Sequence, residues 1–102
     1  MTSLRQHVNQ EAPVQAALIK GLESSGWWVQ KVVGQSRSGL PDVVAAKNGH
    51  VVWVEVKRDG GKLRPSQKRE IPLMRSAGCD VRVVVGKDGV RTFLADIQQE
   101  EQ

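Results

Sequence analysis

An Asn-Gly pair at positions 48–49 limits how this chain can fold more than any other feature. Apolar residues flank the pair, and this setting is the strongest short-range signal for a β-hairpin, because both central residues of a type I′ turn need a positive φ. We therefore expect strands over 41–47 and 50–57. In the register that such a turn imposes, Asp42 faces Glu55, and directly opposed residues have Cβ atoms about 5 Å apart. The sequence thus predicts two carboxyl groups side by side.

An amine accompanies the two acids. Lys57 lies two residues beyond Glu55, so the alternation of a strand returns it to the same face. Both faces of the hairpin are otherwise apolar, which predicts central strands covered on each side. A surface ion pair would explain Glu55 and Lys57, and a turn residue after Pro41 would explain Asp42. Neither explains why the three converge where charges are costly unless paired. Two carboxylates in such a place suit Mg²⁺ or Mn²⁺, so we expect a metal site here.

The rest of the 102-residue chain predicts a single α/β domain with a mixed sheet at its centre. Apolar residues recur at helical spacing from Glu11, and Pro65 suits the first position of a second helix, in which Pro72 predicts a kink or an interruption. We expect a core over about residues 10–95, between a polar N-terminal segment and an acidic C-terminal tail. The expected elements are a helix over 11–25, a strand over 27–33, the hairpin, a helix over 65–77, and strands over 80–85 and 90–94 around a turn at 87–89.

Composition and charge narrow the classes of function. No apolar run approaches the roughly 20 residues of a membrane span, and we expect no signal peptide. A single cysteine, Cys79, excludes an internal disulfide and favours an intracellular location. The net charge is +4, and a basic stretch over 57–69 would either neutralise phosphates or form a solvated loop and helix face. The stretch contains Lys57, Arg58, Lys62, Arg64, Lys68 and Arg69 against the single acid Asp59.

Glu11 is a third candidate for the metal site. On a helix it lies within the arc of Val14 and Leu18, which is the side that faces the core, at the end that can point towards the sheet edge. An acid near a helix N-terminus is also favourable without any role in a site. From the residues alone, both interpretations of Glu11 stay open.

The motifs in this order resemble a known superfamily. Pro41-Asp42 followed by Glu55-Val56-Lys57 resembles the PD-(D/E)xK nuclease signature, and the expected α-β-β-β-α-β order resembles the restriction-endonuclease-like core of that superfamily. A narrower resemblance, to the VRR-NUC branch, covers nearly the whole chain. It rests on Glu11 and Gln15, Ser38-Gly39-Leu40-Pro41-Asp42, Glu55-Val56-Lys57, Leu63-x-Pro65-Ser66-Gln67, and a helix that ends in Ala77-Gly78.

By this resemblance the chain is a metal-dependent nuclease, whose ion polarises the phosphoryl oxygen and lowers the pKa of a water. Lys57 would orient or activate that water and stabilise the charge that develops on the phosphate, with Gln67 beside it. The ligands of the ion would be Asp42, Glu55, the backbone carbonyl of Val56 and, directly or through water, Glu11. The expected contacts to the DNA backbone are Arg37, Ser38, Arg58, Lys62, Arg64 and Ser66.

The resemblance also indicates how the protein would engage DNA. Nothing in the chain resembles a base-reading helix, so we expect recognition by backbone and shape. The branch is similar in core to Holliday-junction resolvases, and its short stand-alone versions resemble viral or bacterial proteins. A chain this small cannot span a four-way junction alone, whereas a symmetric homodimer presents two active sites. One or two of Trp27, Trp28 and Trp53 are candidates for that interface or for stacking on bases, with core packing the favoured alternative for Trp53.

The leading interpretation is a divalent-metal-dependent, structure-selective DNA endonuclease that hydrolyses phosphodiester bonds in the cytoplasm. Two other functions stay open. A non-catalytic DNA-binding module would keep the fold and the basic stretch, but it has no need of opposed buried acids. A metal-dependent enzyme acting on small phosphate esters would need the acids but would show no affinity for nucleic acid at low salt.

Overall fold

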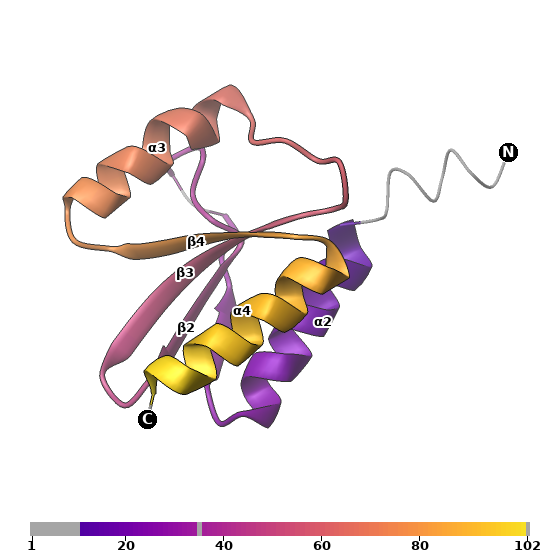
Figure 1. Cartoon of the computed structure of the whole chain (residues 1–102). Helices are drawn as coiled ribbons and strands as arrows, with labels where there is room; N and C mark the ends of the chain where they lie inside the picture. Colours follow the sequence, from indigo (N-terminus) through magenta and orange to yellow (C-terminus); the bar gives the residue numbers. More distant parts are fainter. Residues whose placement is uncertain (1–10, 35, 102) are drawn as a thin grey trace, which may run out of the picture.

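The computed structural model describes residues 11–34 and 36–101, so the polar residues 1–9 lie outside the described part. The elements are α2 (Glu11–Ser24), β1 (Trp28–Lys31), β2 (Val43–Lys47), β3 (His50–Lys57), α3 (Pro65–Ser76), β4 (Asp80–Val85) and α4 (Gly86–Glu100). Figure 1 shows them around a four-stranded sheet of order β1-β2-β3-β4, in which only β3 and β4 are parallel. The predicted α-β-β-β-α-β core is confirmed, although β1 is shorter than the strand expected over 27–33. None of the described helices is long and apolar enough to cross a membrane.

The hairpin has the predicted turn and register. Asn48 and Gly49 have φ values of 50° and 83°, the positive values that a type I′ turn requires. Lys47 pairs with His50, and the antiparallel pairing continues without a break to Val43 opposite Val54. Since β2 and β3 are the two inner strands, this hairpin forms the centre of the sheet.

Two cores lie on the two faces of the sheet. Helices α2 and α4 pack side by side over the larger core (Figure 1). The smaller core lies under α3, where Ile71 and Met74 pack against Val81 of β4. The larger core buries Val14, Leu18, Leu22, Trp27, Val43, Ala45, Val52, Val54, Val56, Val84, Val90, Phe93 and Ile97.

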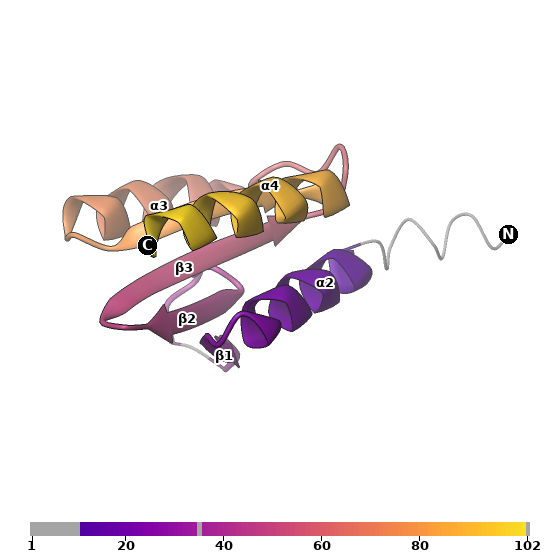
Figure 2. The same ribbon diagram turned by 60° about the horizontal axis from the view of Figure 1, so that its bottom comes forward.

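Helix α3 covers only part of its face. Helix α3 packs against the edge strand β4, and Figure 2 shows β1 at the other edge of the sheet. Trp28 is 60% exposed and Val51 is 48% exposed, so the expectation that both faces of the hairpin are covered is only partly right. Trp27 is buried and Trp53 packs in the smaller core, which leaves Trp28 as the tryptophan available to a partner.

The C-terminal region is a helix up to Glu100, so the turn predicted at 87–89 and the strand predicted over 90–94 are wrong. Val90, Phe93 and Ile97 recur at helical spacing and are buried in the larger core. A short apolar run fits a strand or a helix equally well by its pattern. Residues 86–100 form a helix because packing against α2 buries one of its faces, and an amphipathic helix gains most of its stability in this way.

Helix α3 continues through Pro72, where a kink or an interruption was expected. Pro72 lies on the exposed side of the helix, opposite the buried Ile71 and Met74. Water can therefore hydrogen-bond the carbonyl that loses its N–H partner to proline, and the helix runs on to Ser76.

Candidate active site

Three acids that are far apart in the sequence meet at one end of the sheet. Glu11 begins α2, Asp42 directly precedes β2, and Glu55 lies on β3. A carboxylate oxygen from each lies within 4.8 Å of those of the other two. Of the two interpretations of Glu11, the geometry favours the one that places it with Asp42 and Glu55. Their role as metal ligands stays a prediction.

Backbone groups hold Asp42 in place from the residue that follows β1 and from β3. The N–H of Val32 donates to the backbone carbonyl of Asp42 at 2.8 Å, and the N–H of Val56 donates to Asp42 Oδ2 at 3.1 Å. The sequence singled out the carbonyl of Val56 as a ligand but did not predict its N–H as a partner of Asp42. No side chain marks a backbone donor, so no sequence signal was available for it.

Glu55 is buried, with 1% of its surface exposed. Its Oε2 accepts a hydrogen bond from Gln67 Nε2 at 2.7 Å and lies 3.3 Å from Lys57 Nζ. Its Oε1 is buried and has no hydrogen-bond partner among the described residues. The pKa of Glu55 is raised to about 7, mainly because the carboxyl group is buried and to a smaller extent because the Asp42 carboxylate is near. Lys57 and Gln67 act in the opposite direction and lower it.

Gln67 connects this site to the start of α3. Its side chain is fully buried, its Oε1 accepts from the N–H of Arg64 at 2.9 Å, and its Nε2 donates to Glu55. The first turn of α3 therefore fixes the orientation of the amide, and the amide fixes Glu55. Lys57, which is 5% exposed, completes a buried group of charged and polar side chains. The resemblance implied that Gln67 lies beside Lys57; the structure shows its hydrogen bond to Glu55, and its role in the site stays a prediction.

The donor set at this end of the sheet fits a hard divalent cation. The three clustered groups are all carboxylates, and Glu55 Oε1 is a buried acceptor that still needs a donor or a cation. The only positive group within 4 Å of Glu55 among the described residues is Lys57, which approaches Oε2 and not Oε1. The residues present therefore fit an ion such as Mg²⁺ or Mn²⁺.

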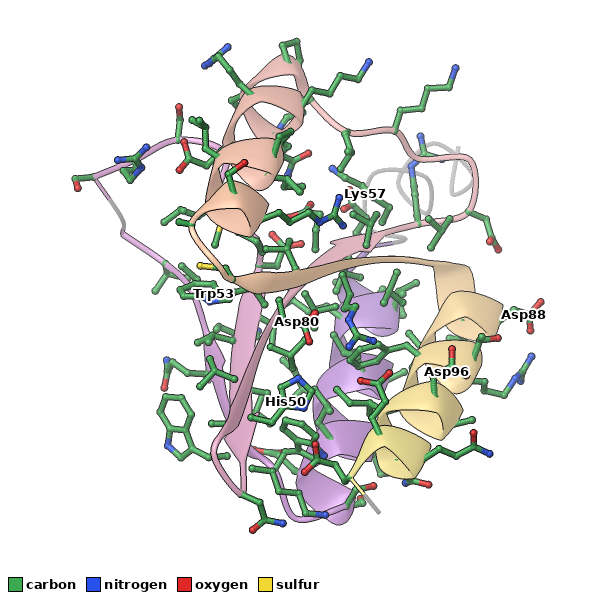
Figure 3. All side chains as sticks on the ribbon, turned by 60° about the vertical axis from the view of Figure 1, so that its left-hand side comes forward. His50, Trp53, Lys57, Asp80, Asp88 and Asp96 are labelled. Atoms are coloured by element: carbon green, nitrogen blue, oxygen red, sulfur yellow. The ribbon has the colours of Figure 1, made fainter. Side chains whose placement is uncertain are left out.

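A second cluster with metal-ligand residues, formed by His50, Asp80 and Glu100, has a different character. Arg82 binds both acids, at 2.6 Å to Asp80 and 2.8 Å to Glu100. Both ring nitrogens of His50 also have carboxylate partners, at 2.8 Å to Asp80 and 2.8 Å to Glu101. Figure 3 shows His50 and Asp80 pointing towards one another. Since these groups satisfy one another, we assign no ion to this cluster.

The predicted DNA contacts lie in the loop before β2, in the loop after β3 and in the first turn of α3. Arg37 binds both carboxylate oxygens of Glu70 on α3, at 2.9 and 3.2 Å, so a phosphate would have to compete for it. Arg58 is partly buried and donates to the carbonyl of Asp59 at 3.1 Å. The remaining predicted contacts are Ser38, Lys62 and Arg64, which are exposed, and Ser66, which is half-buried.

Known proteins resemble this chain in sequence and in structure. The model of the VRR-NUC domain family matches residues 4–88. A protein of Acyrthosiphon pisum secondary endosymbiont phage 1, whose name is "Putative nuclease p44", is 33% identical over 79 residues, which cover 76% of this chain and 85% of the relative.

Solved structures share the fold. One structure of a VRR_NUC domain is 33% identical, has a TM-score of 0.78, and is matched over 84% of this chain and 95% of its own. Hjc from Archaeoglobus fulgidus, a Holliday junction resolvase, is 21% identical with a TM-score of 0.56, over 74% of this chain and 67% of its own; at that identity the likeness concerns the fold alone. The chain belongs to the VRR-NUC family of nucleases.

Proposed function

We propose that this protein is a structure-selective DNA endonuclease that depends on Mg²⁺ or Mn²⁺ and hydrolyses phosphodiester bonds as a homodimer. The observation that carries the proposal is Glu55 Oε1, which is buried without a partner among the described residues and beside two further carboxylates. A buried polar atom left unpaired costs about 1–3 kcal/mol, and more when it is charged. An acid with a strongly perturbed pKa in such a place is characteristic of a functional site.

A bound divalent ion would supply a Lewis acid that polarises the phosphoryl oxygen and lowers the pKa of a water. The side chains of Glu11, Asp42 and Glu55 would hold it, together with the backbone carbonyl of Val56. Magnesium and manganese suit these ligands because hard ions prefer oxygen donors and retain several waters.

Lys57 brings a compact positive charge to the same place. Because its Nζ lies 3.3 Å from Glu55 Oε2, a phosphate that reaches the acids also reaches this ammonium group. Lys57 would orient the attacking water and stabilise the charge that develops on the phosphate oxygens. Gln67 would act as a positioning residue, since it holds Glu55 through a side chain that is fully buried.

The exposed basic side chains and the open sheet face support a dimer on branched DNA. Lys62 and Arg64 would neutralise backbone phosphates, which supplies affinity without base recognition. Trp28 and Val51 form an exposed apolar area that a second copy of the chain would cover. Two symmetric sites would then cut two strands of a four-way junction, the DNA for which the Archaeoglobus fulgidus resolvase is named. The phage relative supports a protein that acts inside a bacterial host cell.

The direct test is a cleavage panel of four-way junction, flap, splayed, linear duplex and single-stranded DNA, each with Mg²⁺, Mn²⁺, Ca²⁺ or EDTA. We expect cleavage with Mg²⁺ or Mn²⁺, none with EDTA, and a preference for branched DNA over the linear duplex. Sedimentation would show a dimer that Trp28→Glu weakens. A wild-type protein that binds DNA and cuts none of the panel would instead support a non-catalytic module.

Variants assign the roles. Lys57→Ala is expected to lower the cleavage rate by about 10²–10³, the usual cost of removing one electrostatic contact to a transition state. Full activity in Lys57→Ala or in Asp42→Asn would contradict the assigned roles. The control is Lys31→Ala, which removes the same charge from the exposed edge strand β1.

A further inference from the structure

A pocket of about 350 Å³ lies beside the acids but on the other side of the sheet from Gln67. It is lined by Pro13, Val14, Arg58, Asp59 and Lys87. We propose that this pocket binds one nucleotide of the DNA strand that is cut, with its phosphate between Arg58 and Lys87. This inference rests on the proposed function and extends it, because it assigns a phosphate contact to α4, which the sequence did not connect with DNA.

The fold brings the lining residues to the same end as the acids. In the parallel pair, Lys57 of β3 lies opposite Val85 of β4, so the residues that follow both strands emerge at one edge of the sheet. Arg58 follows Lys57 directly, and Lys87 comes two residues after Val85. Figure 1 shows the first turns of α2 and α4 and the loop after β3 at this same end. Since Glu11 begins α2, the pocket adjoins the acid cluster.

Basic side chains therefore lie on both sides of the acid cluster. On the α3 side lie Lys62 and Arg64, and on the side of α2 and α4 lie Arg58 and Lys87. A strand whose scissile phosphate reaches Glu55 passes from one side to the other, so a neighbouring phosphate enters the pocket. The volume is at the lower end of the roughly 300–1,000 Å³ of ligand sites, which suits one nucleotide.

The acid in the pocket does not cancel this charge. Gly86, with a φ of 68°, has no side chain, and a Cβ there would collide with the carboxylate of Asp59. Asp59 therefore lies against the first residue of α4, where the positive end of the helix dipole favours a carboxylate. The next acid along α4, Asp88, is paired with Arg91. Among the described residues, neither Arg58 nor Lys87 has a carboxylate partner within 4 Å.

The remaining lining suits a sugar. Pro13 and Val14 belong to the first turn of α2, which Glu11 begins, and they supply apolar lining to the pocket. A deoxyribose can pack on such a wall while its phosphate stays with Arg58 and Lys87. The pocket would thus set the position of the strand relative to the acids, so Lys87 would be a positioning residue.

The test measures binding of a labelled four-way junction in Ca²⁺, so that it does not depend on turnover. Wild type is compared with Lys87→Ala, with Lys87→Arg, and with Lys20→Ala, which removes the same charge from an exposed position far along α2. We expect Lys87→Ala alone to lower the slope of log affinity against log salt by about 0.9, the value for one lost phosphate contact. Lys87→Arg, which keeps the charge, is expected to behave as wild type.

A methylphosphonate scan along the DNA identifies the phosphate that Lys87 contacts. A single neutral methylphosphonate is placed at each phosphate of one strand in turn, and at one position it should weaken binding by wild type but not by Lys87→Ala. Equal effects in both proteins at every position, or a Lys87→Ala protein that binds as Lys20→Ala does, would overturn the inference. A wild-type protein that shows the expected pattern and cuts no DNA with Mg²⁺ or Mn²⁺ would overturn the proposed function and leave the pocket standing.

Discussion

At the scale of the residue, Glu55 shows how the site opposes the stability of the fold. A carboxyl group with a pKa raised to about 7 binds protons more tightly in the folded than in the unfolded chain, whose value is near 4.5. Its contribution to stability is therefore present below about pH 4.5 and is lost as the pH rises through about 7. A bound cation would reverse this loss, because it stabilises the ionised form.

Asp42→Asn tests the cation directly. We expect Mn²⁺ to raise the melting temperature of the wild-type protein, since a ligand that binds only the folded state stabilises it by mass action. Asp42→Asn should remove most of that shift. The control is Asp96→Asn, an exposed acid on α4 that makes the same change of charge. An equal Mn²⁺-induced shift in both variants by scanning calorimetry would exclude Asp42 as a ligand.

Gln67→Ala tests the support of Glu55. The variant loses two hydrogen bonds, to Glu55 Oε2 and to the N–H of Arg64, and leaves the buried Glu55 carboxylate without this donor. We expect a loss of about 1–3 kcal/mol in the free energy of unfolding and about 10–100-fold in cleavage rate. Gln98→Ala, which loses an exposed bond to Ser25, should change neither by much. Urea unfolding and initial rates would measure the two effects, and unchanged cleavage would show that Glu55 holds its position without Gln67.

At the scale of the element, the loop before β2 matters because it carries Asp42. Gly39 has a φ of 85°, and a Cβ there would collide with the carbonyl oxygen of Ser66 and lie 2.6 Å from its carbonyl carbon. The loop and the first turn of α3 can be this close only because residue 39 has no side chain. This contact joins the loop that carries Asp42 to the turn that carries Gln67, and both side chains lie close to Glu55.

Gly39→Ala should therefore lower the free energy of unfolding by more than the strain of placing alanine at a positive φ. Gly34→Ala is a matched control, because Gly34 also has a positive φ, 66°, and a Cβ there would meet no atom within 4 Å from the described residues beyond its chain neighbours. We expect Gly34→Ala to cost about 1–2 kcal/mol. Gly39→Ala should cost about 1–3 kcal/mol more, the usual range for overpacking, and should lower cleavage as well. Equal costs by urea unfolding would mean that the loop can move away from α3 freely.

At the scale of the whole molecule, His50 links the hairpin to β4 and to the end of α4. Both of its ring nitrogens have carboxylate partners, so it can donate both hydrogen bonds only when it is protonated. The pKa of His50 is raised above its usual 6.5, most strongly by the hydrogen bond to Asp80 and then by the hydrogen bond to Glu101. Arg82 lowers the pKa of Asp80 and of Glu100.

The pH dependence of folding should show this link. Because the pKa of His50 is raised by folding, its contribution is full below about pH 6.5 and is lost as the pH rises through the raised value. We expect the free energy of unfolding of the metal-free protein to fall as the pH rises above 6.5 and through the raised pKa of His50, and His50→Gln to remove that part of the fall. Asp80 and Glu100 act in the opposite direction, and only at acid pH. Urea unfolding at intervals of half a pH unit would measure this dependence. A His50→Gln protein whose free energy of unfolding falls with pH as much as that of wild type would contradict the assignment.

Much of the site was predictable because its geometry is local. The turn at Asn48 and Gly49 alone sets the register, and the register places Asp42 next to Glu55 and Lys57 on the same face. The helical arc of Val14 and Leu18 made Glu11 a candidate with two open interpretations, and the family resemblance then indicated Glu11 and Gln67 as site residues. The helix over Gly86–Glu100 was not predicted, because its short apolar run has no unambiguous period.

The sequence by itself determined the hairpin and its register, and with them the position of Asp42 opposite Glu55, because these depend on residues close together in the chain. It also determined the family, through motifs spread along the whole chain. Only the tertiary structure decided that residues 86–100 form a helix, that Glu55 Oε1 is buried without a partner among the described residues, and that Arg58 and Lys87 line one pocket. These features depend on which elements pack together, and packing is set by burial summed over the whole core. The total burial cannot be read from any single segment of the sequence.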